Sequence, residues 1–299
     1  MELGATFPQH EIDDDVEEVA TFARDVEGLE YEQLLAFDHV LGGASHQGGF
    51  DVDNPIHEPL TLFGFLAGIT SSIDLVTGIL ILPQRQTALV AKQAAEVDVL
   101  SENRLRLGIG VGWNHPEYVA LGQDFGGRGT RIEEQINLLR RLWREETVSF
   151  SGDFHEVPDL GINPRPVDDG VPIWMGGGAD AVLRRGARLA DGWIVPNEDF
   201  SAIEEKVDRM KEYLRRYDRD VEEFEIVGRM SLGPDGRLNG PESTTAEDRV
   251  SFAREWERMG VTHLVVSTLG EGYETVVDHT AELSSFMDSV HDSDIDAAR

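Results

Sequence analysis

The chain of 299 residues is 40% hydrophobic and carries a formal net charge of −31 at pH 7. Its length and composition predict one large buried core, and its acidity disfavours binding to nucleic-acid phosphates or anionic membranes. The sequence contains no cysteine, which excludes disulfides, thiolate nucleophiles, iron–sulfur clusters and zinc held by cysteine.

The basic residues are almost all arginine. Lysine occurs only at Lys92, Lys206 and Lys211, each in a helix-like segment, which argues against Schiff-base chemistry. An acidic, lysine-poor surface indicates a halophilic protein, because high salt screens the self-repulsion of the carboxylates. The N-terminal segment MELGATFP lacks the basic and apolar regions of a signal peptide, so we expect a cytoplasmic protein that does not bind membranes.

Strand and helix signals alternate along the whole chain. The expected strands span residues 2–7, 31–37, 72–82, 104–111, 172–175, 192–195, 224–232 and 261–268. The expected helices span residues 13–28, 61–70, 87–100, 132–143, 179–190, 202–217, 245–259 and 273–287, and the third of them is expected to turn Leu89, Val90, Ala94 and Val97 inward.

Eight strands in this alternation fit an α/β fold, the (β/α)8 TIM barrel. We expect one barrel domain over residues 1–290. Residues 145–170 break the rhythm with a hairpin and a proline-rich run, and so form an insertion after the fourth helix. Residues 291–299 are predicted to be an acidic, disordered tail.

In such barrels the active site lies on the loops that follow the carboxyl ends of the strands. The strand at residues 104–111 thins into glycine at that end, where a ligand can approach the backbone closely. The residues expected on these loops are Phe7, Asp38, His39, Gly78 and those after it, Gly112, Trp113, Asn114, Gly176, Gly177, Gly178, Pro196, Asn197 and Arg229.

The three glycines Gly176, Gly177 and Gly178 stand between a strand and a helix that begins near Ala179. Such a loop can cradle a phosphate, because glycine lets the backbone approach and the helix N-terminus offers free N–H groups. The alternative interpretation is a plain tight turn.

His39 can pass a proton to or from a substrate, because imidazole titrates near neutrality. Its alternative role is that of a hydrogen-bonded structural group. His39, His46 and His57 lie in one region but lack the spacing of zinc ligands, so we expect no metal site.

Five segments in order resemble the luciferase-like monooxygenase superfamily, most closely its branch that uses the deazaflavin coenzyme F420. These segments are FDHV at 37–40, LVTGILILP at 75–83, LGIGVGWN at 107–114, PIWMGGGAD at 172–180 and LADGWIVP at 189–196. The resemblance covers most of the chain up to about residue 200.

This resemblance implies that His39 is catalytic and lies beside the reactive ring of the cofactor. It also implies a non-proline cis peptide between Gly78 and Ile79 behind the ring, and a homodimer. The residues that it assigns to cofactor binding are Asp38, Thr77, Gly78, Ile79, Gly112, Trp113, Asn114, Gly176, Gly177, Gly178 and Ala179.

The chain departs from some relatives at Trp113, where they carry a catalytic Glu. Glu117 is the nearest carboxylate in this segment, and its alternative role is to cap a helix.

Three functions are consistent with these residues. The first is an F420-dependent oxidoreductase that transfers a hydride between the deazaflavin and a small organic substrate. The second is a monooxygenase that uses reduced FMN and oxygen, because the two branches share the barrel and the phosphate loop. The third is a cofactor-free barrel that binds a phosphorylated metabolite at Gly176 to Gly178.

Overall fold

The computed structural model describes residues 1–12, 15–43, 52–233, 240–241 and 245–293. The first residues of the first expected helix, His46 with part of its loop, and most of the predicted tail lie outside these ranges.

The described strands alternate with helices in the predicted order. The strands that match the eight expected ones are β1 (Glu2–Thr6), β2 (Gln33–Ala36), β3 (Asp74–Thr77) with β4 (Leu80–Ile81), β5 (Leu105–Gly110), β8 (Ile173–Gly176), β9 (Gly192–Ile194), β10 (Glu225–Ser231) and β11 (His263–Ser267). The third expected strand is thus divided into β3 and β4, and the peptide bond between Gly78 and Ile79 in the gap is cis, as predicted.

These strands form one sheet in the order β3-β2-β1-β11-β10-β9-β8-β5-β4, and β3 pairs with β5 as well. The registered pairs of this sheet are parallel, as in β1 with β11 and β10 with β9. Parallel strands joined by helices, with the pairing continued between β3 and β5, define the (β/α)8 barrel. The predicted fold is therefore confirmed.

The helices fall close to their expected positions, with one addition. They are α1 (Val16–Gly28), α2 (Pro59–Ala67), α3 (Thr87–Leu100), α4 (His115–Ala120), α5 (Arg128–Arg144), α6 (Asp180–Leu189), α7 (Phe200–Arg216), α8 (Ala246–Met259) and α9 (Val276–His291). The short helix α4 was not expected. The predicted hairpin is present as the antiparallel strands β6 (Val148–Ser151) and β7 (Glu156–Leu160).

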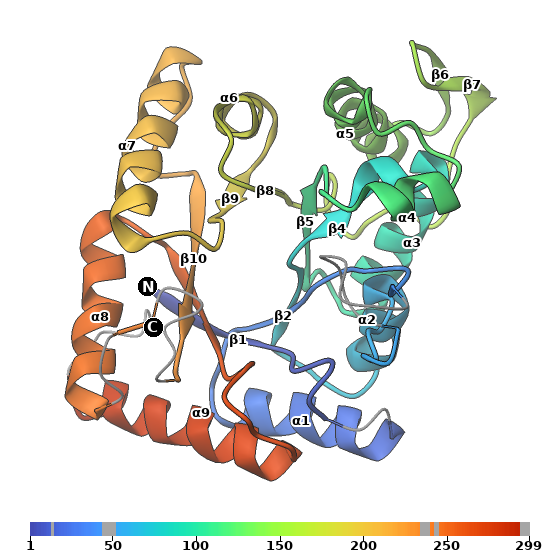
Figure 1. The fold of residues 1–299 in the computed structure, drawn as a ribbon. Coiled ribbons are helices and arrows are strands. Elements are labelled where there is room, and N and C mark those ends of the chain that lie inside the picture. The colour runs from blue at the N-terminus through green and yellow to red at the C-terminus, as the bar shows by residue number, and fades with distance from the viewer. Residues whose placement is uncertain (13–14, 44–51, 234–239, 242–244, 294–299) are drawn as a thin grey trace. The chain divides into compact units, whose positions relative to one another are not determined.

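The chain divides into two compact units. The first unit contains residues 1–36, 72–76 and 174–299, and the second contains residues 37–71 and 77–173. In the first unit, α1 and α9 lie side by side (Figure 1), and the Tyr31 hydroxyl donates to the carbonyl of Leu283 over 3.0 Å. In the second unit, α3 packs against α5, and the indole N–H of Trp143 donates to the carbonyl of Ala91 over 3.0 Å.

The prediction for one core residue of α3 is wrong. Val90, Ala94 and Val97 are buried as predicted, but Leu89 is 52% exposed. The buried face of α3 instead includes Ala91, Ala95 and Asp98. Small alanine side chains let a neighbouring helix approach closely, and the Asp98 carboxylate is buried because it accepts the backbone N–H of Val167 over 2.8 Å.

Candidate active site

His39 and Glu117 form a hydrogen-bonded pair in the second unit. His39 lies in the loop that follows β2, and Glu117 lies in α4, 78 positions further along the chain. The Nδ1 atom of His39 is 3.1 Å from Oε2 of Glu117. Their side chains are 10% and 2% exposed, so the Glu117 carboxylate is almost completely enclosed while the imidazole retains some access.

The second oxygen of Glu117 accepts two backbone hydrogen bonds. The N–H groups of Val40 and Leu41 donate to Oε1 over 2.9 and 3.1 Å. Burial acts to raise the pKa of Glu117, but the hydrogen bonds from His39, Leu41 and Val40 together with the His39 charge outweigh it and hold this pKa below its usual value. Glu117 therefore stays ionised and directs its charge at the imidazole.

The local sequence explains why a buried carboxylate faces His39. Asn114 is the residue before α4, and Pro116 occupies the first turn of that helix, where its missing N–H costs nothing. The Tyr118 hydroxyl donates to the carbonyl of Val111 over 2.5 Å, which ties α4 to the end of β5. Glu117 does not act as a helix cap, so that alternative from the sequence is wrong.

Asp38, next to His39, is held by different partners. Its Oδ2 accepts the backbone N–H of Ile81 over 3.0 Å, and its Oδ1 accepts from Nη2 of Arg85 over 2.8 Å. Burial raises the pKa of Asp38, and Arg85 and the Ile81 N–H oppose that rise only in part. Asp38 thus fixes the loop after β2 against β4, and a contact with cofactor stays a prediction.

Two of the predicted ring-binding residues of the second unit, Thr77 and Gly112, lie at the end of β3 and just after the end of β5. The Thr77 hydroxyl donates to the carbonyl of Gly108 over 2.7 Å, which joins the end of β3 to β5. Gly112 has φ +63°, and a Cβ there would lie 2.7 Å from Cγ2 of Ile81, so a larger residue would be strained and would clash.

Trp113 offers an exposed aromatic surface beside His39. Its side chain is 57% exposed, and its ring centroid lies 5.8 Å from that of His39. Val40 and Leu41 are exposed by 40% and 45%. Exposed apolar side chains thus lie next to a titratable group, and the predicted contact of Trp113 with a cofactor stays a prediction.

The glycine loop lies in the first unit, between β8 and α6. Gly177 has φ +115°, which favours glycine, and its carbonyl accepts the indole N–H of Trp193 over 2.9 Å. A Cβ on Gly178 would lie 2.6 Å from Oε1 of Glu198 and 2.8 Å from Cγ of Pro196. The loop conformation therefore requires these glycines.

The N-terminus of α6 has no side-chain cap. Side chains of Asp15, Thr245 and Thr275 cap α1, α8 and α9, whereas α6, like α3, α4, α5 and α7, has no side-chain cap. Backbone N–H groups at this end of α6 are therefore open to an anion, which fits the predicted phosphate.

A second Glu–His pair in the second unit has a structural role. Nδ1 of His155 is 2.7 Å from Oε1 of Glu134, and its Nε2 is 2.6 Å from the Thr87 hydroxyl. Glu134 also accepts the backbone N–H groups of Asp153 and Phe154, at the turn between β6 and β7. This network fastens the hairpin to α3 and α5.

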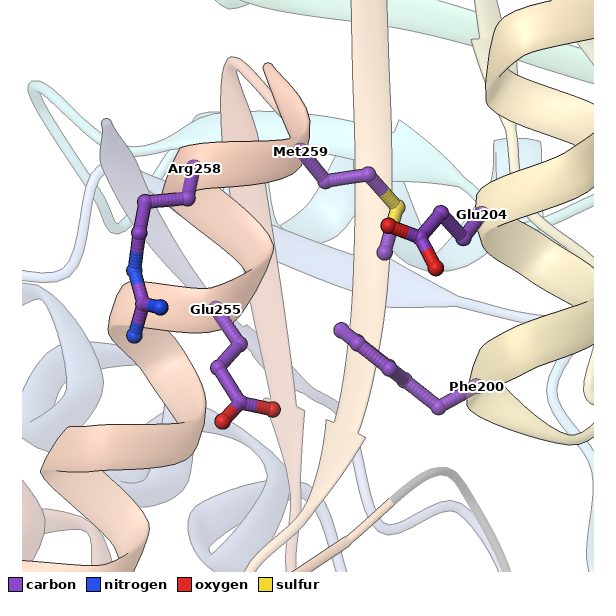
Figure 2. Close-up of a pocket in the computed structure, with 5 residues that line it drawn as sticks. All are labelled: Phe200, Glu204, Glu255, Arg258 and Met259. Carbon is purple, nitrogen blue, oxygen red and sulfur yellow. The ribbon is translucent and has the colours of Figure 1, made fainter.

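A pocket between α7 and α8 of the first unit contains none of the predicted site residues. Figure 2 shows the side chains that line it, which are Phe200, Glu204, Glu255, Arg258 and Met259. Within the described ranges, no group of three or more His, Cys, Asp or Glu side chains could hold a metal ion. None of the helices in this part of the chain is both long and apolar enough to cross a membrane.

Comparison with known proteins identifies the family. The luciferase-like monooxygenase family model matches residues 1–233, so the chain belongs to this family. The predicted family is confirmed, and so is the predicted enzyme class, because members of the family are oxidoreductases that use F420 or FMN.

Two of the relatives are an uncharacterised protein and a monooxygenase. An uncharacterised protein of Mycobacterium tuberculosis is 37% identical over 172 residues, which cover 58% of this chain and 59% of that protein. An FMNH2-dependent dimethylsulfone monooxygenase of Pseudomonas putida is 28% identical over 194 residues, which cover 61% of this chain and 53% of that protein. The chain thus matches between half and three fifths of the length of these curated relatives.

A solved structure of an F420-dependent secondary alcohol dehydrogenase, in complex with an F420-acetone adduct, has the same fold. It superimposes with a TM-score of 0.78 at 15% identity and covers 97% of this chain and 98% of that one. At this identity the likeness supports the barrel fold alone.

Proposed function

We propose that the chain is an F420-dependent oxidoreductase that transfers a hydride between the deazaflavin and a small organic substrate. The observation that carries this proposal is the His39–Glu117 pair beside the exposed ring of Trp113. It supplies a proton acceptor or donor at a place suited to an organic ligand.

Glu117 selects the tautomer of His39. An ionised carboxylate can only accept hydrogen bonds, so Nδ1 of His39 must carry the proton that points to Oε2. In the neutral imidazole, Nε2 is then the basic nitrogen. This is the nitrogen with which His39 takes a proton from a hydroxyl group or, once protonated, returns it.

Bound F420 would supply hydride transfer chemistry. When an alcohol is oxidised, its carbon loses a hydride and its hydroxyl loses a proton, and Nε2 of His39 takes that proton. In the reverse direction the protonated imidazole gives the proton to a carbonyl oxygen. The positive charge that forms on His39 is stabilised by Glu117, whose carboxylate is already ionised.

The local geometry within each unit fits the residues that the family resemblance assigns to cofactor binding. In the first unit, the backbone of Gly176, Gly177, Gly178 and Ala179 and the uncapped start of α6 would hold a phosphate. In the second unit, the backbone from Thr77 to Ile79 and from Gly112 to Asn114 would contact the ring. These assignments rest on the family resemblance together with the local geometry.

The FMN-dependent alternative is favoured by the Pseudomonas putida relative, whose activity is a monooxygenation. His39 would also accept or donate protons in that reaction, so the His39–Glu117 pair alone does not distinguish F420 from FMN. A homodimer, a single barrel domain over residues 1–290, a cytoplasmic location and salt adaptation also stay predictions from the sequence.

Titration of the purified chain with F420 and with FMN, in oxidised and reduced forms, tests the proposal. We expect saturable quenching of F420 fluorescence and turnover of F420 with secondary alcohols. Tight FMN binding with oxygen consumption, and no response to F420, would establish the alternative. Failure to bind either cofactor would overturn both and leave the cofactor-free barrel.

A further inference from the structure

Arg229 of β10 points to the face of the sheet opposite α8. A Cβ on the preceding residue, Gly228, would lie 2.8 Å from the Trp256 ring of α8, and successive side chains of a strand alternate between faces. The Arg229 side chain therefore belongs to the inner face of the first unit.

Register places Arg229 in one layer with Val265, Gly4 and Gln33. Arg229 pairs with Val265, Val265 with Gly4, and Gly4 with Gln33, across β10, β11, β1 and β2. A Cβ on Gly4 would lie 2.9 Å from Cβ of Gln33 and 3.1 Å from Cγ2 of Val265, which confirms that these side chains share a face. This layer offers Arg229 neither a carboxylate nor another charge.

The guanidinium of Arg229 has no partner among the residues that the structure describes, although the side chain is partly buried. Burial lowers its pKa, because the charged guanidinium loses contact with water. Buried Arg104 shows the usual arrangement instead, since it donates to the carbonyls of Ser101 and Thr70 over 2.7 and 3.1 Å. An unpaired, partly desolvated cation costs stability unless a ligand compensates for it.

Gln33 in the same layer is also unsatisfied. It is 1% exposed, and neither its amide nitrogen nor its amide oxygen has a hydrogen-bond partner. Two residues further along each of β10 and β11, toward the carboxyl ends, the same face carries the hydroxyls of Ser231 and Ser267, which pair in register. The inner face at this level is therefore polar and positively charged.

We propose that Arg229 is an anion-binding residue that receives the carboxylate group of a ligand inside the first unit, with the Gln33 amide as a second donor. The planar guanidinium can bind a carboxylate through two parallel hydrogen bonds. Phosphate shares the required oxyanion chemistry. This site goes beyond the proposed function, because it concerns neither His39 nor the glycine loop.

The test uses the full chain without cofactor, titrated calorimetrically with sodium acetate at constant ionic strength. Arg229→Met should weaken acetate binding at least tenfold, while Arg229→Lys keeps the charge and should retain most of it. Arg184→Met is the matched control, because Arg184 is an exposed arginine of the same unit that pairs with Asp180 over 3.0 Å. Acetate binding should be unchanged in this control.

The melting temperature without anion separates binding from a structural role. Arg229→Met should melt at or above the wild-type temperature, because it removes an uncompensated charge. A lower melting temperature, equal acetate binding in Arg229→Met, or no saturable binding by the wild type would overturn the proposal. Displacement of acetate by inorganic phosphate would support the same site and identify phosphate esters as a second source of the anion.

Discussion

Replacement of Glu117 by Gln tests whether this residue sets the tautomer of His39. The Gln oxygen can still accept the N–H groups of Val40 and Leu41, which occupy Oε1 in the wild type. The amide NH2 group then faces Nδ1 of His39 and can only donate. His39 must therefore accept at Nδ1 and carry its proton on Nε2, which removes the base from the substrate side.

The expected loss follows from one charge-assisted hydrogen bond. The Nδ1–Oε2 contact of 3.1 Å joins an imidazole N–H to an enclosed carboxylate, and such bonds contribute about 1.5–3 kcal/mol. If this hydrogen bond stabilises the tautomer in which Nε2 is the base, its loss should lower turnover by about 10- to 150-fold, since each 1.36 kcal/mol is a factor of ten. The cofactor dissociation constant should change little, because Glu117 is 2% exposed.

The assay combines steady-state kinetics with NMR of the chain carrying 15N-labelled histidine. The wild type should show His39 protonated at Nδ1, and Glu117→Gln should show it protonated at Nε2, with a lowered kcat and a nearly unchanged KM. Glu134→Gln is the control, because it alters a Glu–His pair of similar geometry at the hairpin. If both variants keep wild-type turnover, or if the His39 tautomer does not change, the reasoning is refuted.

His39→Ala should lower kcat far more than cofactor affinity, as measured by kinetics and fluorescence titration, whereas equal losses would indicate a role in shaping the pocket. Gly177→Val should weaken cofactor binding in a calorimetric titration, and Gly270→Val, at φ +85° with open space around it, controls for backbone strain alone. The melting temperature should rise with molar KCl, because salt screens a net charge of −31, and a fall would remove the argument for salt adaptation. Burial lowers the pKa of His279 from 6.5 to about 4. Between these pH values the unfolded chain binds a proton that the folded chain does not, so the free energy of unfolding should fall by about 3 kcal/mol as the pH drops from 6.5 to 4. Denaturant unfolding should show a weaker decline for His279→Gln than for the wild type, and parallel curves would contradict this assignment.

Strand and loop positions could be predicted because their signals are local. The apolar alternation of residues 104–111 and the glycines after it are short-range patterns, and both correspond to β5 and the loop that follows. The glycine-rich turn before α6 was found in the same way. Such patterns are informative because some backbone conformations accept few residue types. Gly177, for example, has φ +115°, which favours glycine.

The role of Glu117 could not be predicted, because it depends on a contact between segments 78 positions apart. Helix α4 has only six residues, too few for a periodic apolar pattern. The available signal was a single carboxylate between Pro116 and Tyr118, one helical turn beyond Trp113. Leu89 was misplaced for a related reason, because the face that α3 buries is decided by its packing against α5 and not by hydrophobicity alone.

The two carboxylates that flank His39 have opposite environments and therefore different functions. The Arg85 guanidinium, which also pairs with Glu58, balances the charge of Asp38. The Asp38 carboxylate therefore acts within the protein. One oxygen of Glu117 faces the imidazole that it orients, and two backbone N–H groups hold the other oxygen in place. Neighbouring acids whose pKa values are shifted in opposite directions separate a structural from a chemical role. Neutralising Asp38 should therefore loosen the loop that follows β2, whereas neutralising Glu117 should change which nitrogen of His39 carries the proton and leave that loop in place.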